Sequence, residues 1–246
     1  MASHLIQGRR VDVPVEVRDA TMCSAMYLVR ADAARAVLAY ADLDVTEVLP
    51  GKALCTLAFV RYGDSDLDSY NEFGVAFMVR PPEAGRLPTR GMLSGLKDLR
   101  LNGTGAFIHW LPVDQGFTME AGRTIWGFPK ELAEIDLRLT SPYKRCVLRK
   151  DGRLVLDLLI RPGMPVVGAP TPMEAYSRLD GVTRRTSWTM RPHGVRARPG
   201  GALIRLGNHP IAKELSELGL PKRALMTTTA SHLKMTFHAP IELPHS

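Results

Sequence analysis

Lys130 is the side chain of this sequence best placed to act as a nucleophile, because it closes the aromatic and apolar run Trp126-Gly127-Phe128-Pro129-Lys130. A lysine becomes nucleophilic once it loses its proton, and desolvation lowers the pKa of lysine, whereas arginine stays protonated in proteins. A neutral amine of this kind condenses with ketones to form an imine. The placement indicates a reactive amine, although the five residues alone are more typical of a surface lysine that begins a strand after a proline turn.

Other chemistries lack their usual sequence motifs. The chain contains no G-x-S-x-G elbow, no Walker loop and no G-x-G-x-x-G run, which speaks against the common hydrolases, nucleotide enzymes and dinucleotide enzymes. Asp64, Asp66 and Asp68 imitate the start of a calcium loop, but Ser69 replaces the required glycine and Val75 replaces the bidentate glutamate. The three cysteines are widely spaced, and the seven histidines form no i, i+4 pair near a glutamate. We therefore expect neither a metal site nor a cofactor.

Length and composition are those of an ordinary globular protein. The 246 residues, 45% hydrophobic and 23% charged, are enough for one substantial core, so we expect a single domain over residues 1–246. No apolar run reaches bilayer length and the N-terminal residues show no secretory signal. These features indicate a cytoplasmic protein without a membrane partner.

The net charge of +7 raises the alternative of a nucleic-acid partner, since five arginines lie between Arg184 and Arg198. Aromatic residues make up only 7% of the chain, and no nucleic-acid recognition motif is present. We expect no nucleic-acid binding, because a positive field also attracts small carboxylates.

The elements that must position Lys130 are mostly strands. Residues 53–62 and 70–80 are rich in β-forming residues around the polar turn 63–68, which predicts a long hairpin. The pattern of residues 118–125 predicts a short helix that leads directly to Lys130.

The rest of the chain adds more strands and two more helices. The sequence predicts a helix over residues 33–40 capped by Asp32, a break at 81–85, a strand over 134–139, a tight hairpin at Asp151-Gly152, an irregular loop or lid around Pro162, Pro165, Pro170 and Pro172, a helix over 209–218 and a strand-like segment over 224–243. Together these elements indicate a β-rich α+β fold, built on a large antiparallel sheet or barrel with a few helices outside.

Three segments of the chain resemble a known family. The segment Gly122–Leu132 resembles the active-site segment of the acetoacetate decarboxylase family, with its Gly-Arg pair, its aromatic-Pro-Lys motif and the leucine that follows. Residues 70–74, Tyr-Asn-Glu-Phe-Gly, resemble the family's strand with tyrosine, glutamate and glycine, and residues 229–233, Thr-Ala-Ser-His-Leu, resemble its C-terminal strand. The resemblance spans about residues 18–240 and is concentrated in these islands.

The resemblance implies a cone-like antiparallel β-barrel with a few peripheral helices, assembled into homo-oligomers, whose apolar interior holds a Schiff-base lysine. Acetoacetate decarboxylase is itself the established example of a lysine activated by desolvation or a neighbouring cation. Lys130 matches that lysine, and Glu72 matches a strand glutamate that can stabilise the iminium or move a proton. Trp126 and Phe128 are expected to wall the substrate pocket, and Arg18 is the candidate for contact with the substrate carboxylate.

Three departures from the family pattern weaken decarboxylation of acetoacetate more than they weaken imine chemistry. Glu131 stands where the family's decarboxylases have a second lysine, and Leu57 stands where they have a second glutamate. Arg18 meets the position of the family's arginine only after a shift in spacing. Because neighbours in a strand point to opposite faces, Glu131 is expected to face away from Lys130.

The resulting hypothesis is a Schiff-base carbon–carbon lyase for a small or medium keto acid or ketone, most simply a β-keto acid decarboxylase. A 2-keto acid aldolase or dehydratase that uses the same lysine is an alternative, because all these reactions use the iminium as an electron sink. A ligand-binding barrel without turnover is a second alternative.

Overall fold

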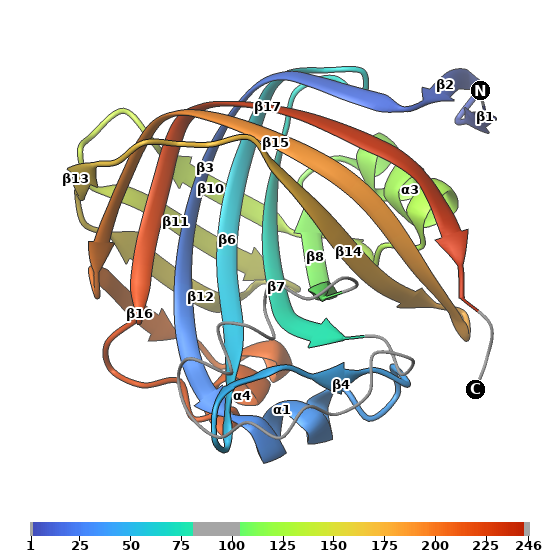
Figure 1. Ribbon diagram of the computed structural model, residues 1–246. Coiled ribbons are helices and arrows are strands. Elements are labelled where there is room, and N and C mark those ends of the chain that lie inside the picture. The colour runs from blue at the N-terminus through green and yellow to red at the C-terminus, as the bar shows by residue number, and fades with distance from the viewer. Residues whose placement is uncertain (1, 81–103, 244–246) are drawn as a thin grey trace.

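Seven long strands of the computed structural model close into a barrel (Figure 1). The structure describes residues 2–80 and 104–243. The barrel strands are β3 (Val15–Arg30), β6 (Lys52–Ser65), β7 (Tyr70–Arg80), β8 (Gly105–Val113), β14 (Thr171–Leu179), β15 (Val182–Pro199) and β17 (Met226–Glu242). In space they follow the order β7-β6-β3-β17-β15-β14-β8, and β8 returns to pair with β7. The β-rich barrel predicted from the sequence is confirmed.

Shorter elements surround the barrel. The other strands are β1 (Ala2–Ile6), β2 (Arg9–Val13), β4 (Asp44–Val45), β5 (Glu47–Leu49), β9 (Lys130–Leu132), β10 (Glu134–Arg138), β11 (Lys144–Lys150), β12 (Arg153–Ile160), β13 (Met164–Pro165) and β16 (Ala202–Leu206). The helices in the described parts of the chain are α1 (Ala31–Val37), α3 (Gly116–Trp126) and α4 (Pro210–Glu217). Each of these helices lies where the sequence predicts one.

The barrel closes through one parallel strand pair. All neighbours in the ring are antiparallel except β8 and β14, which are parallel and pair at Ala106↔Ala175 and Phe107↔Tyr176. Short turns join β6 to β7 and β14 to β15, whereas a long crossover that contains α3 and strands β9 to β13 separates β8 from β14. Such a crossover brings two strands together in parallel.

Two hairpins form where the sequence predicts them. β6 and β7 pair around the polar turn, with Tyr62 opposite Tyr70. β11 and β12 meet at Asp151 and Gly152, whose φ angles of 50° and 69° are both positive. Two positive φ angles in a two-residue loop match the twist of the flanking strands, which explains why an Asp-Gly pair occupies this turn.

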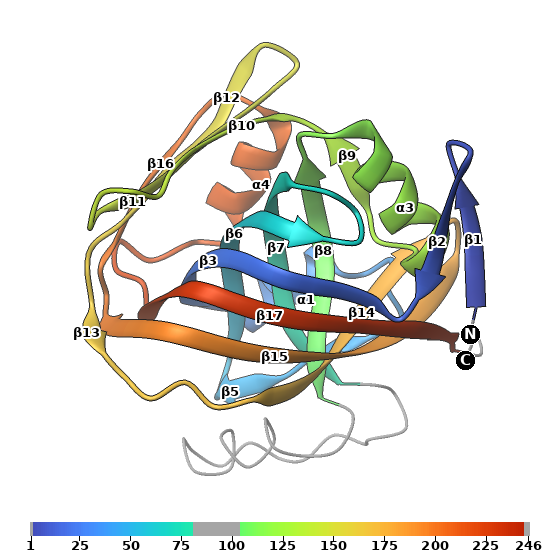
Figure 2. The same cartoon turned by 90° about the horizontal axis from the view of Figure 1, so that it is seen from above.

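A second sheet of four strands, in the order β10-β11-β12-β16, covers one side of the barrel. Figure 2 shows this sheet beside the barrel, with α4 next to it. Outward-facing barrel residues such as Leu57 and Phe59 belong to the same core cluster as Leu148 of the second sheet, and all three are 0% exposed. The larger of the two core clusters therefore lies outside the barrel wall.

The first predicted helix begins differently from expectation. Arg30 occupies the N-cap position and α1 starts at Ala31, so Asp32 lies in the first turn and accepts a hydrogen bond from the Ala33 amide at 2.8 Å.

The break predicted at residues 81–85 lies outside the described residues. None of the described helices is both long and apolar enough to cross a bilayer.

The proline-rich segment is more regular than the sequence predicts. Pro165 lies in β13 and Pro172 lies in β14, where β15 pairs with it at Thr189. At Pro172 no strand of the described residues pairs with the other side of β14, because β8 pairs with β14 only at Ala175 and Tyr176. A strand tolerates a residue without an N–H group best at such an edge.

We expect the protein to lose stability as the pH rises above about 9, because buried thiols resist ionisation. Burial raises the pKa of Cys23 and of Cys55 to about 12 from 9.0. Between these values the unfolded chain has lost protons that the folded chain still holds, so each pH unit costs up to about 1.4 kcal/mol of stability per thiol. Thermal unfolding followed by circular dichroism from about pH 8 to about pH 11 measures this loss.

The variant Cys55→Ala removes one of these titrating groups. It should be less stable than the unaltered protein at neutral pH, but its melting temperature should fall less steeply in the alkaline range. An equal slope for both proteins would contradict the assignment.

Candidate active site

The end of α3 places Lys130 at the wall of the barrel. The helix stops at Gly127, which has a left-handed φ of 63° and donates its amide to the Arg123 carbonyl at 3.1 Å. A glycine in this conformation is a common end to a helix, because it has no Cβ to clash. The chain then enters β9, where Lys130 pairs with Leu111 of β8.

Three hydrogen bonds hold this turn in place. Arg123 Nη1 donates to the Lys130 carbonyl at 3.1 Å. The Ser177 hydroxyl on β14 donates to the Trp126 carbonyl at 2.8 Å, and the Trp126 indole N–H donates to the His238 carbonyl on β17 at 2.9 Å. The backbone that carries Lys130 is therefore tied to α3 and to two barrel strands.

The amine of Lys130 faces a buried carboxylate. Its Nζ lies 2.7 Å from Glu72 Oε2, and the two side chains are 4% and 10% exposed. The Tyr62 hydroxyl donates to Glu72 Oε1 at 2.8 Å, so each carboxylate oxygen has a partner. The Tyr70 ring stacks on Tyr62 with centroids 4.2 Å apart, and its centroid lies 5.0 Å from Nζ. We refer to Lys130, Glu72, Tyr62 and Tyr70 as the Lys130 cluster.

Burial keeps both tyrosines of this cluster protonated. It raises the pKa of Tyr62 and of Tyr70 well above the usual value, and the negative charge of Glu72 raises both further. The Tyr62 hydroxyl therefore remains a donor at neutral pH and can hold one oxygen of Glu72 while the other faces Lys130.

A glycine leaves room for the lysine side chain. A Cβ built on Gly122 of α3 would lie 2.6 Å from Lys130 Cε and closer still to Cδ. Carbon atoms in contact stay roughly 3.5–4.0 Å apart, so a larger residue would have to displace Lys130. The Gly-Arg pair of the motif thus has two roles, with Gly122 providing space and Arg123 holding the backbone.

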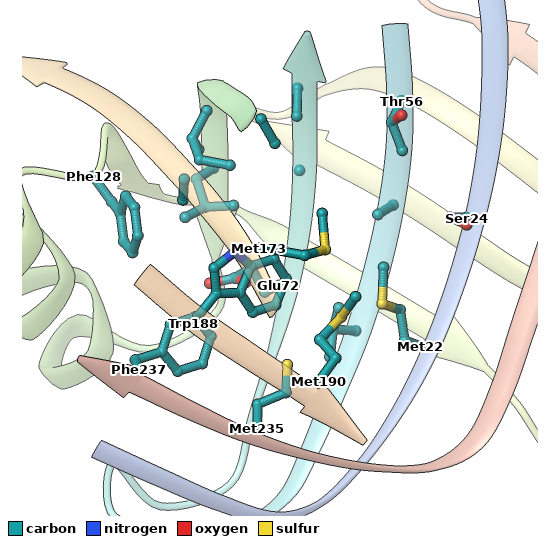
Figure 3. A pocket seen from close by; sticks show the side chains of 18 of the residues that line it. Met22, Ser24, Thr56, Glu72, Phe128, Met173, Trp188, Met190, Met235 and Phe237 are labelled. Carbon is teal, nitrogen blue, oxygen red and sulfur yellow. The ribbon is translucent and has the colours of Figure 1, made fainter. Parts of the chain in front are cut away.

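The Lys130 cluster lines a cavity of about 460 Å³ inside the barrel, and Figure 3 shows part of the cavity wall around Glu72. Among the described residues that line it, Lys130 and Glu72 are the only lysine, arginine, aspartate or glutamate side chains. No three histidine, cysteine, aspartate or glutamate side chains of the described segments gather as a metal site would need. An amine and a carboxylate in contact inside an apolar cavity can exchange a proton and then react with a bound carbonyl group.

Four of the five site residues predicted from the sequence line this cavity. They are Lys130, Glu72, Trp126 and Phe128. The rings of Trp126 and Phe128 stack with centroids 5.9 Å apart and are 2% and 6% exposed. The structure therefore brings Glu72 into the same cavity as Lys130, which lies 58 positions later in the sequence.

Arg18 lies elsewhere, which corrects the expectation that it meets the substrate carboxylate. Val15 and Val17 of β3 face the cavity. Arg18 follows Val17 and precedes the bulge at Asp19, so its side chain points outward. On the outer surface, the Arg18 guanidinium forms ion pairs with the Asp64 carboxylate at 2.8 Å and with the Asp66 carboxylate at 2.6 Å.

The two other departures from the family pattern also point away from the cavity. Glu131 accepts a hydrogen bond from the Trp110 indole and pairs with Lys150 at 3.2 Å, which confirms that it faces away from Lys130. Leu57 points into the core outside the barrel, while its neighbour Thr56 lines the cavity.

Tyr62 is the member of the Lys130 cluster that the sequence did not single out. The signal lies in the predicted hairpin, because Tyr62 pairs with Tyr70 and the alternation of β7 then puts Tyr70 and Glu72 on the same face. The pairing of Tyr62 with Tyr70 can be predicted only when the exact ends of the turn between the two strands are known.

The site and the fold match a known family. The model of the acetoacetate decarboxylase (ADC) family matches residues 7–241, whereas no curated protein sequence matches significantly. The crystal structure of acetoacetate decarboxylase from Legionella pneumophila subsp. pneumophila str. Philadelphia 1 is similar, with a TM-score of 0.68 and 19% identity over 96% of this chain and 91% of that chain.

Two further solved structures share the fold. The enduracididine biosynthesis enzyme MppR, complexed with the condensation product of pyruvate and imidazole 4-carboxaldehyde, has a TM-score of 0.64 and 14% identity over 94% of this chain and 90% of that chain. An acetoacetate decarboxylase-like enzyme from Sphingomonas wittichii RW1 has a TM-score of 0.61 and 15% identity over 99% of both chains. Because the family model matches nearly the whole sequence, this chain belongs to the acetoacetate decarboxylase family.

Proposed function

We propose that this protein is a lysine Schiff-base lyase that decarboxylates a β-keto acid. The observation that supports the proposal is the 2.7 Å contact between Lys130 Nζ and Glu72 Oε2 inside an apolar cavity. Lys130 supplies the nucleophile, and Glu72 is the group in reach that can take its proton and return it.

The reaction begins with an imine. Glu72 accepts a proton from the Lys130 ammonium, and the free amine attacks the ketone carbon. The carbinolamine then loses water as Glu72 returns the proton to the departing hydroxyl group. The aromatic wall of Trp126 and Phe128 keeps bulk water away from the iminium that forms.

Carbon–carbon cleavage follows from the electron demand of the iminium. The electron pair of the bond to the carboxylate moves into the iminium, carbon dioxide leaves, and an enamine remains. Glu72 takes up one proton from solvent and delivers it to the enamine carbon, and hydrolysis of the new iminium releases the ketone and Lys130. The substrate carboxylate is charged before cleavage and gone afterwards, so an apolar lining favours its loss.

An aldol or dehydration reaction of a 2-keto acid is the second candidate. MppR shares the fold and has been seen with pyruvate and with a condensation product. Glu131 and Leu57 also depart from the decarboxylase pattern in the sequence. Both candidates use the same iminium, and release of carbon dioxide distinguishes them.

Sodium borohydride should trap a keto acid on Lys130 as a secondary amine that mass spectrometry locates. The variant Lys130→Arg keeps a cation opposite Glu72 but cannot form an imine, so it should give no adduct. Lys213→Arg changes an exposed lysine of α4 and should leave the adduct intact. If no ketone or keto acid is trapped on Lys130, the protein is a ligand-binding barrel and the lyase proposal fails.

The variant Glu72→Gln should form the adduct more slowly than the unaltered protein and release carbon dioxide about 100-fold more slowly or worse, because a glutamine amide cannot carry the proton in either stage. Glu131→Gln is the matched control, since Glu131 faces Trp110 and Lys150 outside the cavity. Turnover of Glu72→Gln that equals that of Glu131→Gln would remove Glu72 from the mechanism.

The variant Gly122→Ala should slow imine formation by about 100-fold, the typical effect of moving a reacting group by roughly 1 Å. Gly116→Ala is its control in the same helix, because a Cβ at Gly116 meets no atom within 4 Å. The rate of borohydride-trapped adduct formation measures both variants. Equal rates would show that Lys130 does not depend on the space left by Gly122.

A further inference from the structure

The cavity extends far beyond the Lys130 cluster. Glu72, Gly74, Ala76 and Met78 of β7 all line it, and six residues of extended strand span about 20 Å. In Figure 3, Thr56 lies on a part of the wall that is away from Glu72. The reacting groups therefore occupy one end of a long space.

Exposure along β7 is the reverse of what a filled barrel shows. The inward-facing Gly74, Ala76 and Met78 are half-buried, whereas the outward-facing Phe73 and Val75 are 0% and 1% exposed. In a filled barrel the inward side chains occupy the interior and are the best buried. The inward side chains of β7 leave this interior open.

Two kinds of side chain create this space. Small residues on the wall are Ser24, Ala58, Gly74, Ala76, Ala106 and Ala175. Methionines on the wall are Met22, Met26, Met78, Met173, Met190 and Met235. These are six of the 11 methionines in the chain, so the lining concentrates the side chain that adapts best to apolar ligands of varied shape.

The described part of the wall offers no partner for a second charge. Lys130 and Glu72 are the only lysine, arginine, aspartate or glutamate side chains among the described lining residues, and they pair with each other. Arg18 is on the outer surface. A charged tail on the substrate would lose its hydration without meeting a free opposite charge among these lining residues, which is costly.

From these observations we infer the substrate class: a β-keto acid whose ketone carries a hydrocarbon chain of medium length. The inference rests on the proposed lyase function for its reacting end. The ketone lies at Lys130, and the chain runs along β7 past Ala76 towards Met78 and the methionine wall. A cavity of about 460 Å³ lies in the range that encloses ligands of drug size, so a four-carbon keto acid would leave most of it unused.

A chain-length series of 3-oxo acids from four to ten carbons tests this inference, with carbon dioxide release as the readout. The value of kcat/KM should rise roughly threefold to fourfold for each added methylene until the space is filled. Values that stay flat or fall with chain length would overturn the inference while leaving the lyase proposal standing.

Ala76→Leu should act as a plug at mid-length of the cavity. It should lower kcat/KM for the ten-carbon acid at least about tenfold more than for the four-carbon acid. Ala58→Leu, on the neighbouring strand β6, repeats the test should the first variant fold poorly. Ala36→Leu adds the same atoms to an exposed site on α1 and should change neither substrate. An equal effect of the plug on both acids would contradict the proposed path of the chain.

Binding without turnover separates this inference from the lyase proposal. In the Lys130→Arg variant, quenching of tryptophan fluorescence should report tighter binding of 2-decanone than of 2-butanone, because Trp188 lines the cavity. The added methylenes predict a difference of about 100-fold or more. Equal affinity for the two ketones would overturn the apolar-chain inference, whatever the outcome of borohydride trapping.

Discussion

The contact between Lys130 and Glu72 is the constraint on which the site depends. Moving two charged groups out of water costs several kcal/mol for each, and the cost is offset only when partners are held in good geometry. β8 sets that geometry, because it pairs with β7 opposite Glu72 at Val113 and with β9 opposite Lys130 at Leu111. Two strand spacings place the two backbones about 10 Å apart, a gap that only a long side chain such as lysine can bridge.

The residues around this contact serve to keep it in place. Tyr62 holds the second oxygen of Glu72, and Arg123 holds the backbone of Lys130. Gly122, which has no side chain, leaves the space that the aliphatic part of the Lys130 side chain occupies. Most of the motif Gly122–Lys130 can therefore be understood as support for the position of one amine, with Trp126 and Phe128 also forming the wall of the cavity.

Local patterns in the sequence predicted the three described helices and two of the hairpins, since these elements depend on nearby residues, but they did not predict the long barrel strands β3 and β15. The Asp151-Gly152 turn and the helix before Lys130 are examples. Arg18 was misplaced because its direction depends on strand alternation and on a bulge beside Asp19, which spacing alone does not reveal. The parallel closure of β8 on β14 was missed because it joins segments separated by α3 and three strands of the second sheet. The family resemblance, and not the local pattern, pointed to Glu72 as the partner of Lys130.

The hydrophobic core outside the barrel wall has a consequence for how such proteins diversify. Leu57, Phe59 and Leu148 contribute to folding from the far side of the strands, while Ala58 and Ala76 on the inner side contribute little buried area. Adding or removing carbon atoms on the inner face can thus alter which molecules fit without undermining the architecture. Robustness and selectivity are carried by opposite faces of the same strands, so mutation can adjust one while the other is preserved.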